Sequence, residues 1–132
     1  MDPRIERAQE LYWRIYGPGH TLQAGHSSDL VEMAGLHEAI ARDRLGQDDA
    51  LGWIDLYAAV TVWGDAGRLP HAHSLIAWGR ERATGFPSMR DDILRELSAL
   101  ERWLEQKPAF IEFSDLIRRN LARDVDRLAL IG

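Results

Sequence analysis

His37 and Asp55 stand where the surrounding sequence is least suited to a polar group. His37 falls on the apolar stripe of a predicted helix, and Asp55 is the only charge in the segment Ala50–Gly64. A buried carboxylate is costly unless it is paired or hydrogen-bonded, so we expect Asp55 to contact Arg44, a Trp indole N–H or His37. A contact with Asp55 would orient the His37 ring as acid–base catalysis requires. Because no nucleophile with a motif of its own accompanies the pair, we interpret it as a buried polar tie that fixes the register of two helices.

The other histidines lack the spacing of a metal site. His71 and His73 are two residues apart on a predicted helix and therefore point about 160° away from each other, whereas ligands that share a helix are three or four residues apart. His20 and His26 would reach His37 only through a fold that the sequence does not reveal. The chain has no cysteine, which excludes thiolate metal sites and thiol catalysis. We predict neither a metal nor a cofactor.

The segment Gly17–Ser28 is the longest break in periodicity, and its three glycines and one proline predict a loop. It is not a phosphate-binding loop, because five residues rather than four separate Gly19 from Gly25 and His26 stands in place of the lysine. Long ordered loops are often functional. We therefore treat His20 and His26 as candidate contacts with a partner.

Aspartates are concentrated in the middle of the chain, where no basic residue interrupts them. The run consists of Asp48, Asp49, Asp55 and Asp65. We predict that Asp48, Asp49 and Asp65 contact a partner protein with a basic or neutral surface. Trp13, which falls off the apolar stripe of its own helix, is a further predicted contact.

Arginines recur every four residues near the end of the chain, at Arg119, Arg123 and Arg127. Such a ladder could bind an acidic protein, an RNA backbone or a nucleotide phosphate. Interleaved aspartates favour the alternative, a solvated face with salt bridges along it. The net charge of −5 also argues against non-specific binding to nucleic acid, because that affinity comes from neutralising phosphates.

The elements that must position these side chains are helices. The segment Ala50–Gly64 carries large apolar residues on every face of a helix, and a helix without a polar face is normally surrounded by neighbours. We therefore predict a buried central helix at about residues 49–66, which is shorter than the roughly 20 apolar residues of a membrane span. Asp48 or Asp49 is expected to cap it.

Caps and apolar stripes predict five further helices around the central one. Their starts are Asp2 with Pro3, a capping box of Asp29 and Glu32, Pro70, Ser88 and Ser114. Tyr16, Gly46, the segment Gly85–Pro87 and Pro108 mark the predicted ends of the first, second, fourth and fifth helices. Ile5, Ala8, Leu11, Tyr12 and Ile15 form the inward stripe of the first, and Ile117, Leu121, Val125 and Leu128 that of the last. No strand pattern is present, so we predict an all-α fold, a compact bundle of about six helices and a single domain over residues 1–132.

Small and large residues recur at a regular spacing in residues 50–84. They are Leu56, Ala59, Trp63, Gly67, Ala72, Ile76 and Gly79. This pattern resembles a tetratricopeptide repeat, although Val60 stands where the family has Gly or Ala and Thr84 where it has proline. The resemblance implies a scaffold that binds peptides or proteins. The alternative is a pair of well-packed helices, and no second copy of the pattern is found.

Two classes of function remain open. The N-terminal segment is charged from its second residue, which favours a cytoplasmic protein without a secretory signal. We predict a non-enzymatic, acidic protein-binding domain, either an inhibitor or immunity-type protein or an adaptor that masks its partner, without membrane or direct nucleic-acid contact. The alternative is a small helical enzyme or ligand-binding domain that uses His37, Asp55 and the loop at residues 17–28.

Overall fold

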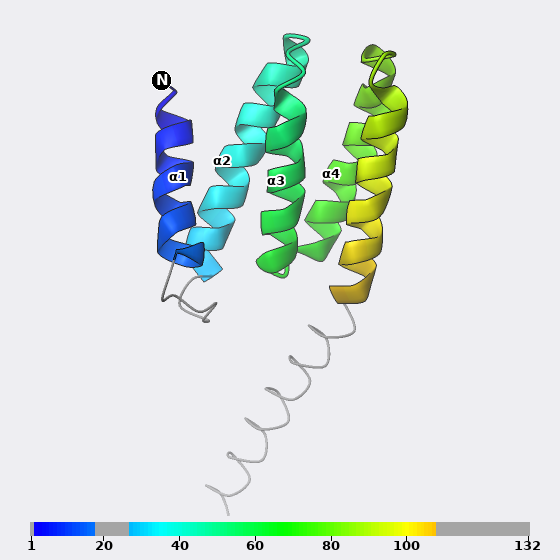
Figure 1. Ribbon diagram of the computed structural model, residues 1–132. Coiled ribbons are helices and arrows are strands. Elements are labelled where there is room, and N and C mark those ends of the chain that lie inside the picture. Colours follow the sequence, from blue (N-terminus) through cyan, green and yellow to red (C-terminus); the bar gives the residue numbers. More distant parts are fainter. Residues whose placement is uncertain (1, 18–26, 108–132) are drawn as a thin grey trace, which may run out of the picture.

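The computed structural model describes residues 2–17 and 27–107, and these residues form five α-helices, one short 3-10 helix and no strand (Figure 1). The elements in chain order are α1 (Pro3–Tyr16), α2 (Ser27–Gly46), α3 (Gly52–Asp65), α4 (Leu69–Arg82), the short 3-10 helix η2 (Ala83–Gly85) and a fifth helix at residues 90–107. The all-α fold class is therefore confirmed. The predicted sixth helix, with its arginine ladder, lies outside the described residues, as do His20 and His26.

α1 begins and ends where its sequence predicts. The side chain of Asp2 accepts a hydrogen bond from the backbone N–H of Arg4 at 2.9 Å, and Pro3 occupies the first helical position, where no N–H is needed. Ala8, Leu11 and Ile15 are buried on one face. Tyr12 was predicted to face inward with this stripe, and that prediction was wrong, because half of its surface is exposed.

The helices lie side by side in chain order, and each neighbour runs antiparallel to the one before (Figure 1). α2 packs against both α1 and α3, and α4 packs against α3. The fifth helix packs on α3 and α4, since Leu104 approaches Gly64 and Leu97 approaches Gly79. In Figure 1, α1, α3 and the fifth helix form the nearer layer and α2 and α4 the farther one.

Two apolar clusters form the interior, and α2 and α3 contribute to both. One cluster joins α1 to the first half of α2 and to Val62 of α3. The other joins the end of α2 to Trp53, Leu56 and Val60 of α3, and to α4 and the fifth helix. On α4, Ala72, Leu75, Ile76 and Gly79 are buried, and so is Ala83 directly after it.

The arrangement around α3 differs from the predicted bundle. Trp53, Leu56 and Val60 are buried, but Ile54 is 66% exposed, and Leu51 just before the helix is also exposed. Neighbours from the described part of the chain therefore cover α3 on several sides and leave one side open. The predicted enclosure of α3 on every side is therefore not confirmed by the described residues.

The predicted caps of α2 and α3 also need correction. α2 begins at Ser27, so Asp29 lies within its first turn and is not the cap. The left-handed conformation after α2 falls on Asp48, with φ of 58°, a conformation that aspartate tolerates better than most residues. Asp49 does not cap α3 directly, because its side chain accepts from the N–H of Leu51, one residue before the helix.

Among the described helices, none combines the length with the apolar character that a membrane span requires.

Candidate functional site

A groove lies between α1 and α3, with α2 as its floor, and we call it the α1–α3 groove. It consists of two adjoining pockets of about 230 and 300 Å³, and both include Tyr12 and His37. The first is lined by Ile5, Ala8, Gln9, Tyr12, His37, Ile40 and Asp55. The second is lined by Tyr12, Tyr16, Met33, His37, Ala58, Thr61, Val62 and Asp65. Most of the groove is therefore apolar or aromatic, with polar groups at a few fixed points.

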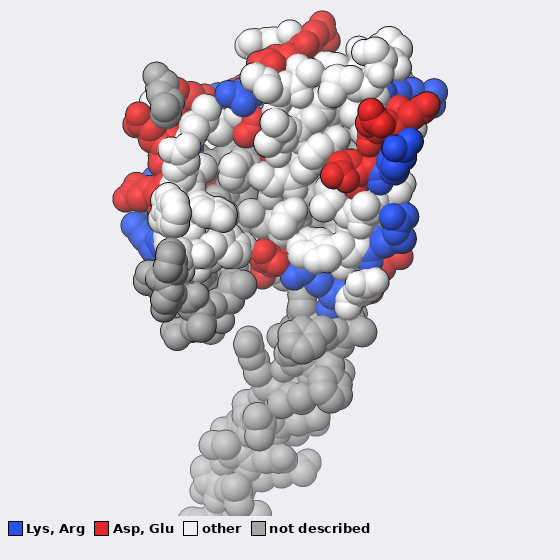
Figure 2. Space-filling view, viewed as in Figure 1, with Lys and Arg blue, Asp and Glu red and all other residues white. Residues whose placement is uncertain are grey.

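Exposed apolar side chains border this groove. Tyr12 of α1 is 50% exposed, and its neighbour Trp13 is 62% exposed and meets the Tyr12 ring edge-on at 5.8 Å. On α3, Ile54 precedes Ala58 by one helical turn and shares its open side. Figure 2 shows uncharged side chains over much of the middle of this face, with Lys, Arg, Asp and Glu mostly towards its edges.

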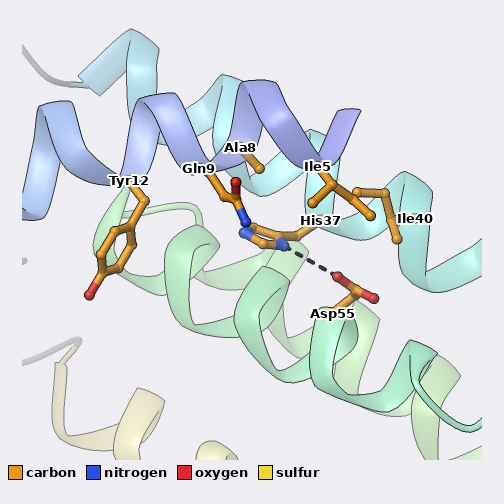
Figure 3. A pocket seen from close by; sticks show the side chains of 7 residues that line it. All are labelled: Ile5, Ala8, Gln9, Tyr12, His37, Ile40 and Asp55. Carbon is orange, nitrogen blue, oxygen red and sulfur yellow. Dashed lines mark ion pairs between the residues drawn. The ribbon is translucent and has the colours of Figure 1, made fainter. Parts of the chain in front are cut away.

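His37 lies at the junction of the two pockets. Its Nδ1 is 3.6 Å from Oδ1 of Asp55, which is an electrostatic contact but too long for a hydrogen bond, and this buried nitrogen has no hydrogen-bond partner among the described residues (Figure 3). Burial lowers the pKa of His37 below its ordinary value, and the Asp55 carboxylate opposes that effect only in part. The ring is therefore neutral near pH 7. Figure 3 shows the Gln9 side chain directed towards the same ring.

Asp55 has a strong partner inside the chain. Nη1 of Arg44 donates a hydrogen bond to its Oδ2 at 2.9 Å, and only 12% of the Asp55 side chain is exposed. Arg44 and His37 are seven residues apart on α2, so two helical turns place both on the side that faces α3. The carboxylate thus has an arginine at one oxygen and a neutral imidazole near the other. This arrangement ties α2 to α3 at the edge of the groove.

The opposite end of the groove is closed by Asp65. Its Oδ2 accepts a hydrogen bond from the Tyr16 hydroxyl at 2.6 Å, and its Oδ1 accepts one from Nζ of Lys107 at 2.8 Å. Burial, with the nearby Asp65 charge, raises the pKa of Tyr16, which keeps the hydroxyl protonated as a donor. The Lys107 ammonium also lies 4.3 Å from the centre of the Trp103 ring. Asp65 therefore joins α1, α3 and the end of the fifth helix.

The structure separates the aspartates that the sequence groups together. Asp48 is exposed and Asp49 is partly exposed before the start of α3, whereas Asp65 is its last residue. A helix of this length spans about 20 Å, so the run does not form one acidic surface. Both oxygens of Asp65 are already engaged within the chain.

A second polar cluster lies at the α2, α3 and α4 contact. Glu38 accepts hydrogen bonds from the indole N–H of Trp63 and from Nε of Arg42, and its Oε1 is 2.6 Å from Nε2 of His71. Burial raises the pKa of Glu38, but the hydrogen bonds from His71 and Arg42 outweigh it and the net pKa is lowered. Glu38 therefore remains ionised and holds three elements together. Within residues 2–17 and 27–107, no group of three or more His, Asp or Glu side chains could hold a metal ion.

Tyr12 and Ile54 are the groove residues that sequence reasoning missed, since both were expected to face inward. One signal pointed to the open side of α3. Thr61 and Asp65 follow Ile54 at helical spacing, so this side of the helix becomes polar towards its end. A gradient of this kind indicates partial contact with water.

Comparison with known proteins gives no relative: no family model, curated protein or solved structure matches the chain. Function must therefore be inferred from the groove itself.

Proposed function

We propose that this protein is a binding domain whose α1–α3 groove receives an apolar helical segment of a partner protein. The observation that carries this proposal is the exposure of Tyr12 and Ile54 on either side of a largely apolar hollow. Large exposed apolar side chains beside a concave apolar surface are typical of interaction sites. A helix laid between α1 and α3 would bury both residues, in the manner of helix-in-groove recognition.

The order of the helices supports the same interpretation. Two antiparallel pairs, α1 with α2 and α3 with α4, are followed by a fifth helix. Repeat scaffolds stack helical pairs in this way and present one helix of each pair on a common binding face. The tetratricopeptide-like pattern falls on α3 and α4, and we propose that α1 and α2 form a second, divergent pair of the same kind.

Exposed carboxylates lie on the far side of α3 from the groove. Asp91, Asp92 and Glu96 are exposed on the fifth helix. Burial, followed by the nearby charges of Glu96 and Asp92, raises the pKa of Tyr57 on α3 to about 12. These carboxylates therefore lie close to α3 on the side away from α1. Such a domain would serve as an adaptor or as an inhibitor that masks its partner.

The test compares two substitutions of exposed apolar helix residues by aspartate. Ile54→Asp places a charge in the groove, whereas Ala77→Asp places one on the exposed side of α4. Burying an isoleucine side chain contributes about 1.5–3 kcal/mol, so Ile54→Asp should weaken capture of a specific protein by roughly 10-fold to 100-fold. The measurement is affinity capture from native extract by the unmodified, Ile54→Asp and Ala77→Asp chains, followed by the Kd of the purified species for each.

Support requires a species that binds the unmodified chain and the Ala77→Asp variant equally and is lost with Ile54→Asp. Equal binding to all three chains would reject the groove as the docking site. Circular dichroism of both variants verifies that the helices are retained.

A second candidate function is binding of a small molecule at His37. The observation in its favour is the buried Nδ1 of His37, which lines a pocket of about 230 Å³ and has no hydrogen-bond partner within the described part of the chain. A ligand with a polar donor and an apolar body would fit this pocket. In that case a metabolite should raise the melting temperature of the protein, and His37→Ala should abolish the rise.

A further inference from the structure

We propose that the segment of residues 114–131 of this same chain binds the α1–α3 groove and covers it until a partner displaces it. The segment lies outside the described residues. The inference rests on the position of the last described residue, on the number of residues beyond it and on their apolar pattern. It uses the groove of the proposed function, but it requires no partner.

The described chain ends beside the groove. Lys107 is the last described residue, and its Nζ donates a hydrogen bond to Asp65, which lines the second pocket. Residues 108–113 can span at most about 20 Å when extended. A segment that begins at Ser114 therefore starts within reach of the Asp65 end of the groove.

The apolar pattern of this segment has the length of the open side of α3. Ile117, Leu121, Val125 and Leu128 recur at helical spacing, and the first and last are eleven residues apart. The open side of α3 runs from Ile54 to Asp65, which is the same separation and about 16 Å along a helix. If the segment starts at Asp65 and runs antiparallel to α3, Leu128 lies beside Ile54. The exposed Ile54 and Tyr12 then gain apolar neighbours from the same chain.

An occupied groove has a regulatory consequence. Tethered binding competes with any partner for the same apolar surface, because the linker holds the segment at a high local concentration. A partner would bind only by displacing it, and a substitution that releases the segment would increase the apparent affinity for the partner. The chain would thereby control access to its own binding site.

The experiment measures distances in the full-length chain between pairs of spin labels attached to introduced cysteines. Because the sequence has no cysteine, the labels attach only at the introduced positions. One label replaces Gln47, an exposed residue at the Ile54 end of the molecule. The second label replaces either Ala129 or Asn120. On a helix these two positions lie on opposite sides of the apolar stripe. We expect narrow distance distributions. The Gln47–Ala129 distance should be shorter than the Gln47–Asn120 distance by about 10 Å, because Ala129 lies nine helical residues beyond Asn120.

A pair of variants serves as the control. Leu121→Asp, which places a charge in the apolar pattern, should broaden both distributions, whereas Ala122→Asp, which lies off that pattern, should leave them unchanged. Broad distributions in the unmodified chain, or the reverse order of the two distances, would overturn the proposal. If the short distance disappears when labelled protein is diluted with unlabelled protein, a second copy occupies the groove and the proposal also fails.

The two proposals can fail separately. If Ile54→Asp abolishes capture of a partner but the spin-label distances are broad, the proposed function stands and self-occupation is wrong. If the distances are narrow and ordered as expected but no partner depends on Ile54, self-occupation stands and the proposed function is wrong.

Discussion

His37, Arg44 and Asp55 show how a polar group is accommodated in an apolar helix pair. The need for a partner was predictable from the single charge in its segment, because an unpaired carboxylate is costly there. The sequence could not decide among the candidate partners. That choice depends on the rotation of α2 relative to α3, which places Arg44 at 2.9 Å and His37 at 3.6 Å from the two carboxylate oxygens.

Asp55→Asn should lower the free energy of unfolding by about 1–3 kcal/mol, because a charge-assisted hydrogen bond is lost and Arg44 is left without its counter-charge. The matched control is Asp92→Asn. The Asp92 side chain is 80% exposed and pairs with Arg95 at 3.5 Å, so its loss should cost less than about 0.5 kcal/mol. Urea denaturation at pH 7 measures both. If both substitutions changed the free energy of unfolding equally, the buried Asp55 ion pair would contribute no more to stability than the exposed Asp92 pair.

His37 should make stability fall with acidification. Its pKa is lowered in the folded protein, so the unfolded chain binds more protons as the pH drops below about 6.5. This penalty is absent above that pH and complete below the folded pKa. Urea unfolding at pH 7.5 and pH 5 should therefore show a larger loss for the unmodified protein than for His37→Gln. An identical loss in both proteins would mean that His37 keeps the same pKa in the folded and unfolded states.

At the scale of elements, α3 illustrates what periodicity can and cannot predict. Its helical state and the burial of Trp53, Leu56 and Val60 follow from composition, since apolar residues need neighbours. The open side at Ile54 does not follow. It depends on α1 and α3 packing on separate sides of α2, so that no described helix covers the surface between them. The start of α1 was predictable because a capping residue and a proline coincide at Asp2 and Pro3. The predicted start of α2 was wrong because the helix begins before its first acidic residue.

Two glycines in the α2–α3 pair should respond oppositely to alanine. A Cβ on Gly52 would lie 2.9 Å from Cβ of Arg44 and 3.0 Å from the backbone nitrogen of Leu45, so Gly52→Ala forces the two helices apart. We expect a loss of about 1–3 kcal/mol. Gly35, inside α2, has no atom within 4 Å of such a Cβ, so Gly35→Ala should gain about 0.5–1 kcal/mol from helix propensity. Thermal unfolding of both variants measures the contrast, and a gain for Gly52→Ala would refute close contact at this point.

At the scale of the whole molecule, stability depends on polar contacts between helices as well as on the two apolar clusters. Arg80 pairs with Glu101 through both nitrogens of its fork, and Arg82 donates to the carbonyl of Leu45 at 2.7 Å. Asp65 adds a tie across three helices. The sequence contains all of these charges, but the pairing of residues so distant in the chain becomes evident only in the folded arrangement.

Lys107→Gln should release the end of the fifth helix from α3. The variant loses the charge-assisted hydrogen bond to Asp65 and the contact with the Trp103 ring. We expect a decrease of about 1 kcal/mol in the free energy of unfolding, with faster hydrogen exchange confined to the last turns of the fifth helix. Unchanged exchange at those amides would show that the apolar contacts alone hold the helix end in place.

Lys107 is also the sole lysine in the sequence, which has a practical consequence for the chemistry of labelling. Amine-reactive dyes and resins can attach to one side chain only, beside the Asp65 end of the groove, and acylation there removes the charge that Asp65 binds. A chain immobilised through this side chain would therefore present an altered surface to any ligand in solution. A tag placed away from that end avoids the artefact, whereas a dye attached there reports directly on events in the groove.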